Sequence, residues 1–501
     1  MLTGRMLPRA GVVVALAAAA GLAVWNHTLT LAAGQPVPQP SAVPVGAVLR
    51  ACPAPGLQGS PDAQVALIAG PGASGTGRAV VNYFGAAPGA PLLSVTQPGA
   101  LSVTKVRSFA SLAHAKTPPA PSSAGQQVPT LPAPGGVLIQ ATGSMARGLE
   151  AEQVTGGRMA ARCAGPGTDF WFAGPGVYTA PKVYLYLMNP SGQAADVTVQ
   201  AETDAGPLVG GTDTGIAVAP HAMVVQSLAK ILHGARAMAL HVRTSVGQVV
   251  AAVEEVTGSA HTGAWLPALT PPANQVVIPG LPPTAGTRQL FVAVPGTTNA
   301  HITLRAITTK GSYEPTGGTG IDIPGGSVVG IPLTSLSAIP GALQVSANVP
   351  VTASVLIPGG PRGTPGTFAG AVGAIQEQGV VAASVSGGGS ASALVLSAPW
   401  RAVRARVTEI VQGTGAQAVT SEVLQVRADH SLVDQLGKAA SRHGATFAVI
   451  VTPLAGSGPL YAGRVITGAG KGGALLSILP VPSALTTVPL PAVRAALVSP
   501  G

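Results

Sequence analysis

Acidic side chains that stand in pairs are the first candidates for chemistry in this chain of 501 residues, because two carboxyl groups can act as a general acid and a general base. The pairs are Glu150 with Glu152 and Glu254 with Glu255. A glycosidase needs its two carboxyl groups at a fixed separation across a sugar cleft. Adjacent strand residues point to opposite faces, so Glu254 and Glu255 do not suit that role. We predict solvated strand ends at both pairs and no catalytic residue.

Glycine-rich motifs, histidines and serines are the next candidates, as sites for cofactors, metals or nucleophiles. Two G-x-G-x-x-G sequences begin at Gly70 and Gly468. A dinucleotide site also needs a following helix and an acidic residue about 20 positions later, and neither sequence has that residue. The nine histidines are isolated, without the spacing of metal ligands. No Gly-x-Ser-x-Gly nucleophile motif occurs. The sequence therefore predicts no cofactor site and no metal site.

The chain contains only two cysteines, Cys52 and Cys163. In an exported protein an even number of cysteines favours a disulfide. Closing a loop of this length contributes on the order of 4 kcal/mol to stability. Two free or catalytic thiols are the alternative, but no Cys-x-x-Cys spacing supports it. We predict a disulfide between these residues.

Phe170, Trp171 and Phe172 form the densest aromatic cluster. Exposed aromatic rings can stack on sugars, so the three residues are candidates for an interaction site. Alternate residues of a strand share a face, however, which places Phe170 and Phe172 on one side and Trp171 on the other. A core strand that leads into the next domain is the favoured interpretation.

Charge and composition argue against a nucleic-acid partner. The 27 basic residues outnumber the 17 acidic ones and give a net charge of +10, but only 9% of residues are charged and 3% are aromatic. Proteins that bind phosphate backbones cluster Lys and Arg on one face and interleave aromatic residues. Here the basic residues are scattered, so we predict no nucleic-acid binding.

The N-terminus has the pattern of an export signal. Arg5 and Arg9 precede an apolar run over residues 10–25. We predict that residues 1–34 are a retained anchor helix, which would attach the protein to the cell membrane in a single pass with its C-terminal region outside the cytoplasm. Cleavage after Ala32-Ala33-Gly34, giving a secreted protein, is the alternative. Proline-rich residues 35–51 are predicted to form a stalk.

A recurring pattern of strand signals predicts the architecture. Within residues 182–256, residues 197–202 and 238–243 alternate apolar with polar side chains, as in strands with one buried face. Pro220-His221 lies between two further strand segments and is predicted to turn a hairpin. The same order of signals returns in residues 302–356, more loosely in 403–466, and most degenerately in 93–154. Each copy has six or seven short strands, which predicts an all-β protein of tandem immunoglobulin-like or fibronectin III-like sandwiches. A propeller is the alternative fold.

The copies and linkers divide the chain into segments. One helix is predicted, at Ser431–His443, where apolar residues recur near one face before Gly444. The predicted divisions are a signal or anchor at 1–34, a stalk at 35–51, a degenerate β domain with the disulfide at 52–178, sandwiches at 179–267 and 268–378, a sandwich with the helix at 379–480, and a tail at 481–501.

Several short motifs carry a resemblance to a known family. They are Cys52-Pro, the segment from Arg162-Cys-Ala-Gly-Pro-Gly to Asp169-Phe-Trp-Phe172, Asn189-Pro190, Trp265-Leu-Pro267 and Pro350-Val-Thr-Ala353. In this order, after an N-terminal anchor, they resemble an uncharacterised family of exported actinobacterial proteins with repeated β domains. The family's function is unknown, so the resemblance implies no catalytic residues.

Three functional hypotheses follow from these observations. The favoured one is a non-enzymatic protein of the cell envelope that acts as a structural or interaction module, with an envelope protein or glycan as partner. A carbohydrate-binding protein is the second and would need an exposed aromatic platform. An extracytoplasmic hydrolase is the third and would need an acid or a nucleophile in a cleft.

Overall fold

The computed structural model describes residues 41–490 and contains almost only β-strands. The described residues include no α-helix, only one turn of 3-10 helix, η1 (Ser144–Ala146). The all-β prediction is therefore confirmed. The following internal segments are not described: 54–61, 72, 86–90, 108–135, 156–158, 179–181, 209–214, 230, 258–261, 285–286, 335, 337, 359–365, 384–389, 413–416, 438–445 and 471–472.

The helix predicted at Ser431–His443 is wrong. Its first half belongs to β31 (His430–Leu436), which pairs antiparallel with β28 (Ser390–Ala398), and residues 438–445 lie outside the described part. Short apolar runs satisfy helical and strand periodicity equally well. Here the hydrogen bonds that β28 offers decide between them, because they form only if the segment is extended.

Two compact units make up the chain, and each is described by itself. Residues 1–44 and 487–501 form the first, in which β1 (Ser41–Pro44) pairs antiparallel with β35 (Thr487–Leu490). The predicted anchor at residues 1–34 lies outside the described residues. Within the described residues no helix is long and apolar enough to cross a bilayer. The predictions of a membrane partner and of a single-pass membrane location are corrected accordingly.

The second unit, residues 45–486, contains four successive β-sandwiches. The strands of the first are β2 (Ala47–Cys52), β3 (Ala63–Ile68), β4 (Gly77–Tyr83), β5 (Leu93–Val95), β6 (Ser102–Val106), β7 (Val137–Gly143), β8 (Glu150–Thr155) and β9 (Met159–Arg162). Those of the second are β10 (Asp169–Pro175), β11 (Lys182–Met188), β12 (Ala195–Thr203), β13 (Gly206–Pro207), β14 (Ile216–Val218), β15 (Met223–Ser227), β16 (Ala237–Val246), β17 (Val250–Thr257) and β18 (Thr262–Leu266).

The third and fourth sandwiches repeat this order of elements. The third consists of β19 (Ala273–Leu281), β20 (Arg288–Val294), β21 (Ala300–Thr308), β22 (Gly311–Tyr313), β23 (Ile321–Ile323), β24 (Ser327–Leu333), β25 (Gly341–Ile357) and β26 (Thr367–Gly370). The fourth consists of β27 (Gly379–Ala383), β28, β29 (Val403–Gln412), β30 (Gln417–Val426), β31, β32 (Thr446–Pro453), β33 (Tyr461–Gly470) and β34 (Gly473–Pro480).

All four sandwiches share one strand order. One sheet runs first, sixth, third and fourth strand, as in β2-β7-β4-β5 and β27-β32-β29-β30; the other runs fifth, second, seventh and eighth, as in β6-β3-β8-β9 and β31-β28-β33-β34. In the second and third sandwiches the fourth position is shared by two short strands. In the third, β25 serves both sheets, since its first half pairs with β21 and its second half with β20. The prediction of tandem β-sandwiches is confirmed, with β10 as the first strand of the second sandwich.

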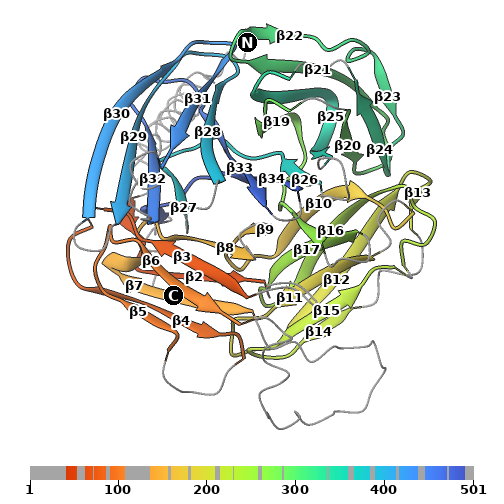
Figure 1. Cartoon of the computed structure of the whole chain (residues 1–501). Helices are drawn as coiled ribbons and strands as arrows, with labels where there is room; N and C mark the ends of the chain where they lie inside the picture. Colours follow the sequence, from red (N-terminus) through yellow and green to blue (C-terminus); the bar gives the residue numbers. More distant parts are fainter. Residues whose placement is uncertain are drawn as a thin grey trace, which may run out of the picture. The chain divides into compact units, whose positions relative to one another are not determined.

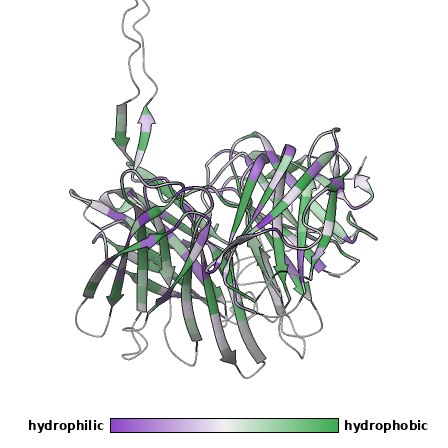
Figure 2. Ribbon diagram, turned by 90° about the horizontal axis from the view of Figure 1, so that it is seen from above, coloured by the Kyte–Doolittle hydropathy of each residue, from purple (hydrophilic) through white to green (hydrophobic). Residues whose placement is uncertain are grey.

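The predicted strand alternation is borne out along β12 and β16. Val197, Val199 and Ala201 on β12 face the core of the second sandwich together with Leu240 and Val242 on β16. The residues between them are more exposed, as the period of two requires. Figure 2 shows apolar and polar residues mixed in this way along single strands.

The predicted hairpin at Pro220-His221 is a crossing between sheets. The strand before it, β14, pairs with β12, whereas the strand after it, β15, pairs with β11 in the other sheet. The segments β5 to β6 and β23 to β24 cross in the same way. Proline and glycine mark where a strand ends but not which strand the chain joins next.

Within this unit the sheets also pack face to face between sandwiches, in a closed cycle that Figure 1 lets the reader follow. Ala66 and Ile68 of the first sandwich contact Ala448 and Ile450 of the fourth. Further clusters join the fourth to the third, the third to the second and the second to the first. Eight sheets therefore follow one another like propeller blades, although none has the simple meander of a propeller blade.

A pair of glycines permits the closest of these approaches. A Cβ atom added to Gly463 on β33 would lie 2.6 Å from Cα of Gly280 on β19. Any larger residue at position 463 would separate the backbones of the third and fourth sandwiches.

Candidate functional site

The edge of each sandwich that carries its first and eighth strands is closed by an antiparallel bridge. The residues just after the eighth strand pair back onto the first strand of the same sandwich. The four bridges are Ala51 with Ala164, Trp171 with Leu269, Val277 with Val372, and Gly379 with Ser483. Repetition of one bridge at four equivalent places brings four equivalent segments to one region of the unit.

These segments surround a cavity of about 200 Å³. All four sandwiches contribute to its walls, with Arg162 and Ala164 from the first, Trp265 and Pro267 from the second, Ala371 and Val372 from the third, and Leu479 and Pro480 from the fourth. Most of the lining is alanine, proline and aliphatic side chains. Arg162 is the only ionisable residue in that lining.

Arg162 belongs to a cluster with excess positive charge. Its Nη2 lies 2.6 Å from Oε2 of Glu150, and Nη2 of Arg50 lies 3.0 Å from Oε1 of the same carboxylate. The Glu150 side chain is 2% exposed, whereas that of Arg162 is 27% exposed. Two guanidinium groups thus share one buried carboxylate, and the more exposed of the two reaches the cavity.

Trp265 on β18 also lines the cavity. Its indole N–H is buried and has no hydrogen-bond partner among the described residues. The ring packs at 5.2 Å, centre to centre, from that of Tyr186. A buried donor without a partner costs free energy.

Glu254 lies behind this aromatic pair. The hydroxyl of Tyr186 donates a hydrogen bond of 2.5 Å to its Oε2. Burial and the neighbouring Glu254 raise the pKa of Tyr186 well above its usual value, so the phenol stays protonated and remains a donor. Glu254 is therefore fixed as an acceptor inside the contact between the first two sandwiches.

Glu152 and Arg464 form a buried ion pair between the first and the fourth sandwich. The Glu152 carboxylate also accepts a hydrogen bond of 3.2 Å from the backbone N–H of Ala382, and Nε of Arg464 donates one of 3.0 Å to Ser392. Burial raises the pKa of Glu152, and the charge of Arg464 opposes that shift.

The prediction that both acidic pairs are solvated strand ends is wrong. Glu150, Glu152, Glu254 and Glu255 are all buried, with exposed fractions between 2% and 7%. They lie on β8 and β17, the seventh strands of their sandwiches. Each of these strands is central in its sheet, with one face toward the core of its own sandwich and the other covered by the neighbouring sandwich. The hydrolase hypothesis would need a carboxyl group that is free to meet a substrate, whereas three of these four carboxylates are engaged by arginine or tyrosine.

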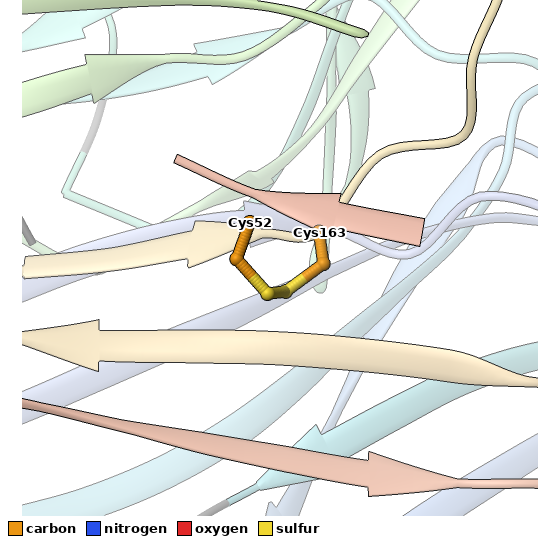
Figure 3. The surroundings of a disulfide bond; sticks show 2 residues. All are labelled: Cys52 and Cys163. Carbon is orange, nitrogen blue, oxygen red and sulfur yellow. A yellow bond between two sulfur atoms is a disulfide. The ribbon is translucent and has the colours of Figure 1, made fainter. Parts of the chain in front are cut away.

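The disulfide between Cys52 and Cys163 is present, as predicted. Figure 3 shows it joining the end of β2 to the segment after β9. Its two cysteines are neighbours of the bridged residues Ala51 and Ala164, and both are fully buried. The disulfide reinforces covalently the bridge that the other three sandwiches make with hydrogen bonds alone.

The aromatic residues proposed for interaction lie in packed positions. Phe172 is 1% exposed in the core of the second sandwich, and Phe170 packs against that core. Trp171 is 7% exposed and lies between the second and third sandwiches, stacked on His241 at 3.8 Å. A sugar platform would need exposed rings, which Trp171 and Phe172 do not provide.

The described residues contain no group of three or more His, Cys, Asp or Glu side chains arranged to hold a metal ion. The sequence did not single out Arg162 and Trp265 as site residues. Two signals were available: both residues belong to the motifs that carry the family resemblance, and each lies in an eighth strand that leads to a repeated bridge.

Comparisons with known proteins add a family but no activity. No curated protein matches the sequence. One solved structure that shares similarity is a calcium-binding mutant of β-glucuronidase 2 from Bacteroides uniformis, at 7% identity and a TM-score of 0.10. The match covers 62% of this chain but only 26% of that protein. A score this low carries no argument about fold or function.

The model of a family of unknown function, DUF5719, matches residues 121–434, which is more than half of the chain. The matched region runs from the first sandwich to the fourth and includes Arg162, Trp265 and the second cysteine. This agrees with the resemblance seen in the sequence motifs to an uncharacterised family. The chain belongs to the family of unknown function DUF5719.

Proposed function

We propose that this protein is a non-enzymatic interaction module of the cell envelope that binds a small apolar group with an anionic end in its central cavity. The observation that carries the proposal is the pairing of an apolar cavity built by four sandwiches with two arginines that share one carboxylate. The excess positive charge at Arg162 favours an anion, and the apolar walls favour a hydrocarbon body.

The size of the cavity limits the ligand. A cavity of 150 Å³ is large enough for benzene, and this one measures about 200 Å³. A benzoate-sized acid, or the end of a longer molecule with that chemistry, would fill it.

The disulfide supports a location in an oxidising compartment. Structural disulfides persist outside the cytoplasm, where thiols are not kept reduced. Burial of both cysteines beside the cavity is consistent with a permanent structural bond.

Titration calorimetry with benzoate and with benzyl alcohol tests the proposal. Benzoate is expected to bind at least tenfold more tightly than the alcohol, because only the acid meets the charge of Arg162. The variant R162M should lose most of that difference, since it removes the guanidinium nearest the cavity. Arg404 on β29 is exposed, so R404M is a matched control and should bind as the unchanged protein does.

Two results would contradict this function. One is absence of benzoate binding by a correctly folded protein at millimolar ligand. The other is equal affinity in R162M and R404M, which would show that binding does not use the cavity arginine.

A further inference from the structure

The fourth strand, which forms an outer sheet edge, is different in the fourth sandwich. In the first sandwich this position is held by β5, with three residues, and in the second and third it is split between two strands of two or three residues. In the fourth it is β30, a continuous strand of ten residues paired along its whole length with β29. Figure 1 shows β30 on the outside of its sheet.

This long edge lacks the usual protection against pairing. Exposed edge strands are commonly short, or carry lysine, proline or a bulge, because their free N–H and C=O groups can pair with another chain. β30 has no lysine, no proline and no register shift, and Glu422 is its only charged residue. Seven consecutive residues, 417–423, are exposed. The three other sandwiches have short or interrupted edges, so the same fold can be built without this feature.

Two exposed valines give the edge a definite pattern. Val419 is 58% exposed and Val423 is 49% exposed. They are four residues apart and therefore lie on the same face of the strand, with Ser421 midway between them.

From this pattern we infer that β30 pairs antiparallel with β30 of a second copy of the chain, about a two-fold axis at Ser421. In this register Val419 of each copy faces Val423 of the other, and Ser421 faces its own counterpart. Both exposed valines of each copy thus gain an apolar cross-strand partner. The two four-stranded sheets become one continuous eight-stranded sheet.

The charges of the edge agree with this register. Glu422 of one copy faces Thr420 of the other, whose hydroxyl can donate to the carboxylate. Shifting the axis by one residue to Glu422 would place two carboxylates opposite each other, which is unfavourable. Self-pairing is therefore compatible with the sequence of β30 in the register that the valines require.

Site-directed cross-linking of the full chain tests the register. In directly opposed positions of an antiparallel pair the Cα atoms lie about 4.5–5.5 Å apart, which is within the range that a disulfide spans. The variant S421C is expected to form a disulfide-linked dimer under mild oxidation. The variant Q425C is the matched control, because Gln425 is also exposed on β30 but would lie roughly 27 Å from its counterpart, which is eight residues away along the paired strands. The native cysteines are already paired and buried, so they do not interfere.

Sedimentation equilibrium measures association without cross-linking. The unchanged chain is expected to be a concentration-dependent dimer, and the double variant V419K/V423K should raise its dissociation constant at least tenfold. Both positions are exposed, so the lysines leave the fold intact, which far-ultraviolet circular dichroism will check. A chain that stays monomeric at 100 μM, or equal cross-linking of S421C and Q425C, would overturn the inference. A monomer whose β30 binds an extended peptide of another protein would overturn it in favour of that partner.

Discussion

Glu255 shows how a single buried carboxyl group can make stability depend on pH. It lies two residues after Val253 on the core-facing side of β17. Its neighbours on the adjacent strands are Val183 and Ala264. Burial raises its pKa from 4.5 to about 7. The folded state therefore holds the proton of Glu255 more tightly than the unfolded state does. The contribution of this carboxyl to the free energy of unfolding is fully present below pH 4.5 and is lost as the pH rises through 7.

Replacing Glu255 with glutamine should remove this dependence. At pH 4 the variant E255Q is expected to be about as stable as the unchanged protein, and at pH 8 more stable by about 3 kcal/mol, since each unit of pKa shift corresponds to about 1.4 kcal/mol. Urea unfolding at the two pH values measures the difference. The exposed residue Glu314 provides the control E314Q, which should change stability little at either pH. A gain in E255Q that is equal at pH 4 and pH 8 would argue against titration of this carboxyl.

At the scale of the structural elements, the disulfide is expected to stabilise the first sandwich. Cys52 and Cys163 are 111 residues apart in the sequence, and closing such a loop contributes on the order of 4 kcal/mol by restricting the unfolded chain. The variant C52A/C163A should lose about that much in guanidinium unfolding, with a lower midpoint. The unchanged protein in reductant should approach the same midpoint. A variant whose midpoint is unchanged would mean that hydrogen bonds alone hold the bridge between Ala51 and Ala164, as in the other sandwiches.

The same scale shows why some elements were predicted and others were not. The alternation in β12 and β16 identified strands with one buried face, because burial of alternate residues is a local requirement. The hairpin predicted at Pro220-His221, between β14 and β15, and the helix predicted at β31 were wrong. Their sequences contain turn and apolar signals, but β14 pairs with β12, β15 with β11 and β31 with β28, and none of these partners is the next strand in the sequence.

For the whole unit 45–486, the contact between the first and last sandwiches decides whether the cycle stays closed. The buried pair of Glu152 and Arg464 lies at this contact. Removing one partner of a buried pair leaves an uncompensated charge and costs about 3–5 kcal/mol, whereas replacing both with neutral groups costs much less. R464M should therefore destabilise the protein strongly, and E152Q/R464M should recover most of the loss.

Thermal or denaturant unfolding of the two variants measures this coupling. If the double variant E152Q/R464M is as unstable as R464M, Arg464 stabilises the protein through its packing and not through its charge. The exposed arginine at position 406 offers the control R406M, for which a change of less than about 0.5 kcal/mol is expected.

By itself the sequence determined the all-β class, the four-fold repetition, the faces of strands such as β12, and the disulfide, since these follow from local periodicity, from repeated order and from there being only two cysteines. It could not determine that β5, β14 and β23 lie in a different sheet from the strands that follow them, or that the sandwiches pack in a closed cycle. That packing buried Glu150, Glu152 and Glu254, the core of the second sandwich buried Glu255, and the four sandwiches together placed Arg162 and Trp265 at one cavity. The physical reason is that pairing, burial and charge compensation depend on residues hundreds of positions apart, as Glu152 and Arg464 are. Only the tertiary structure brings such residues together.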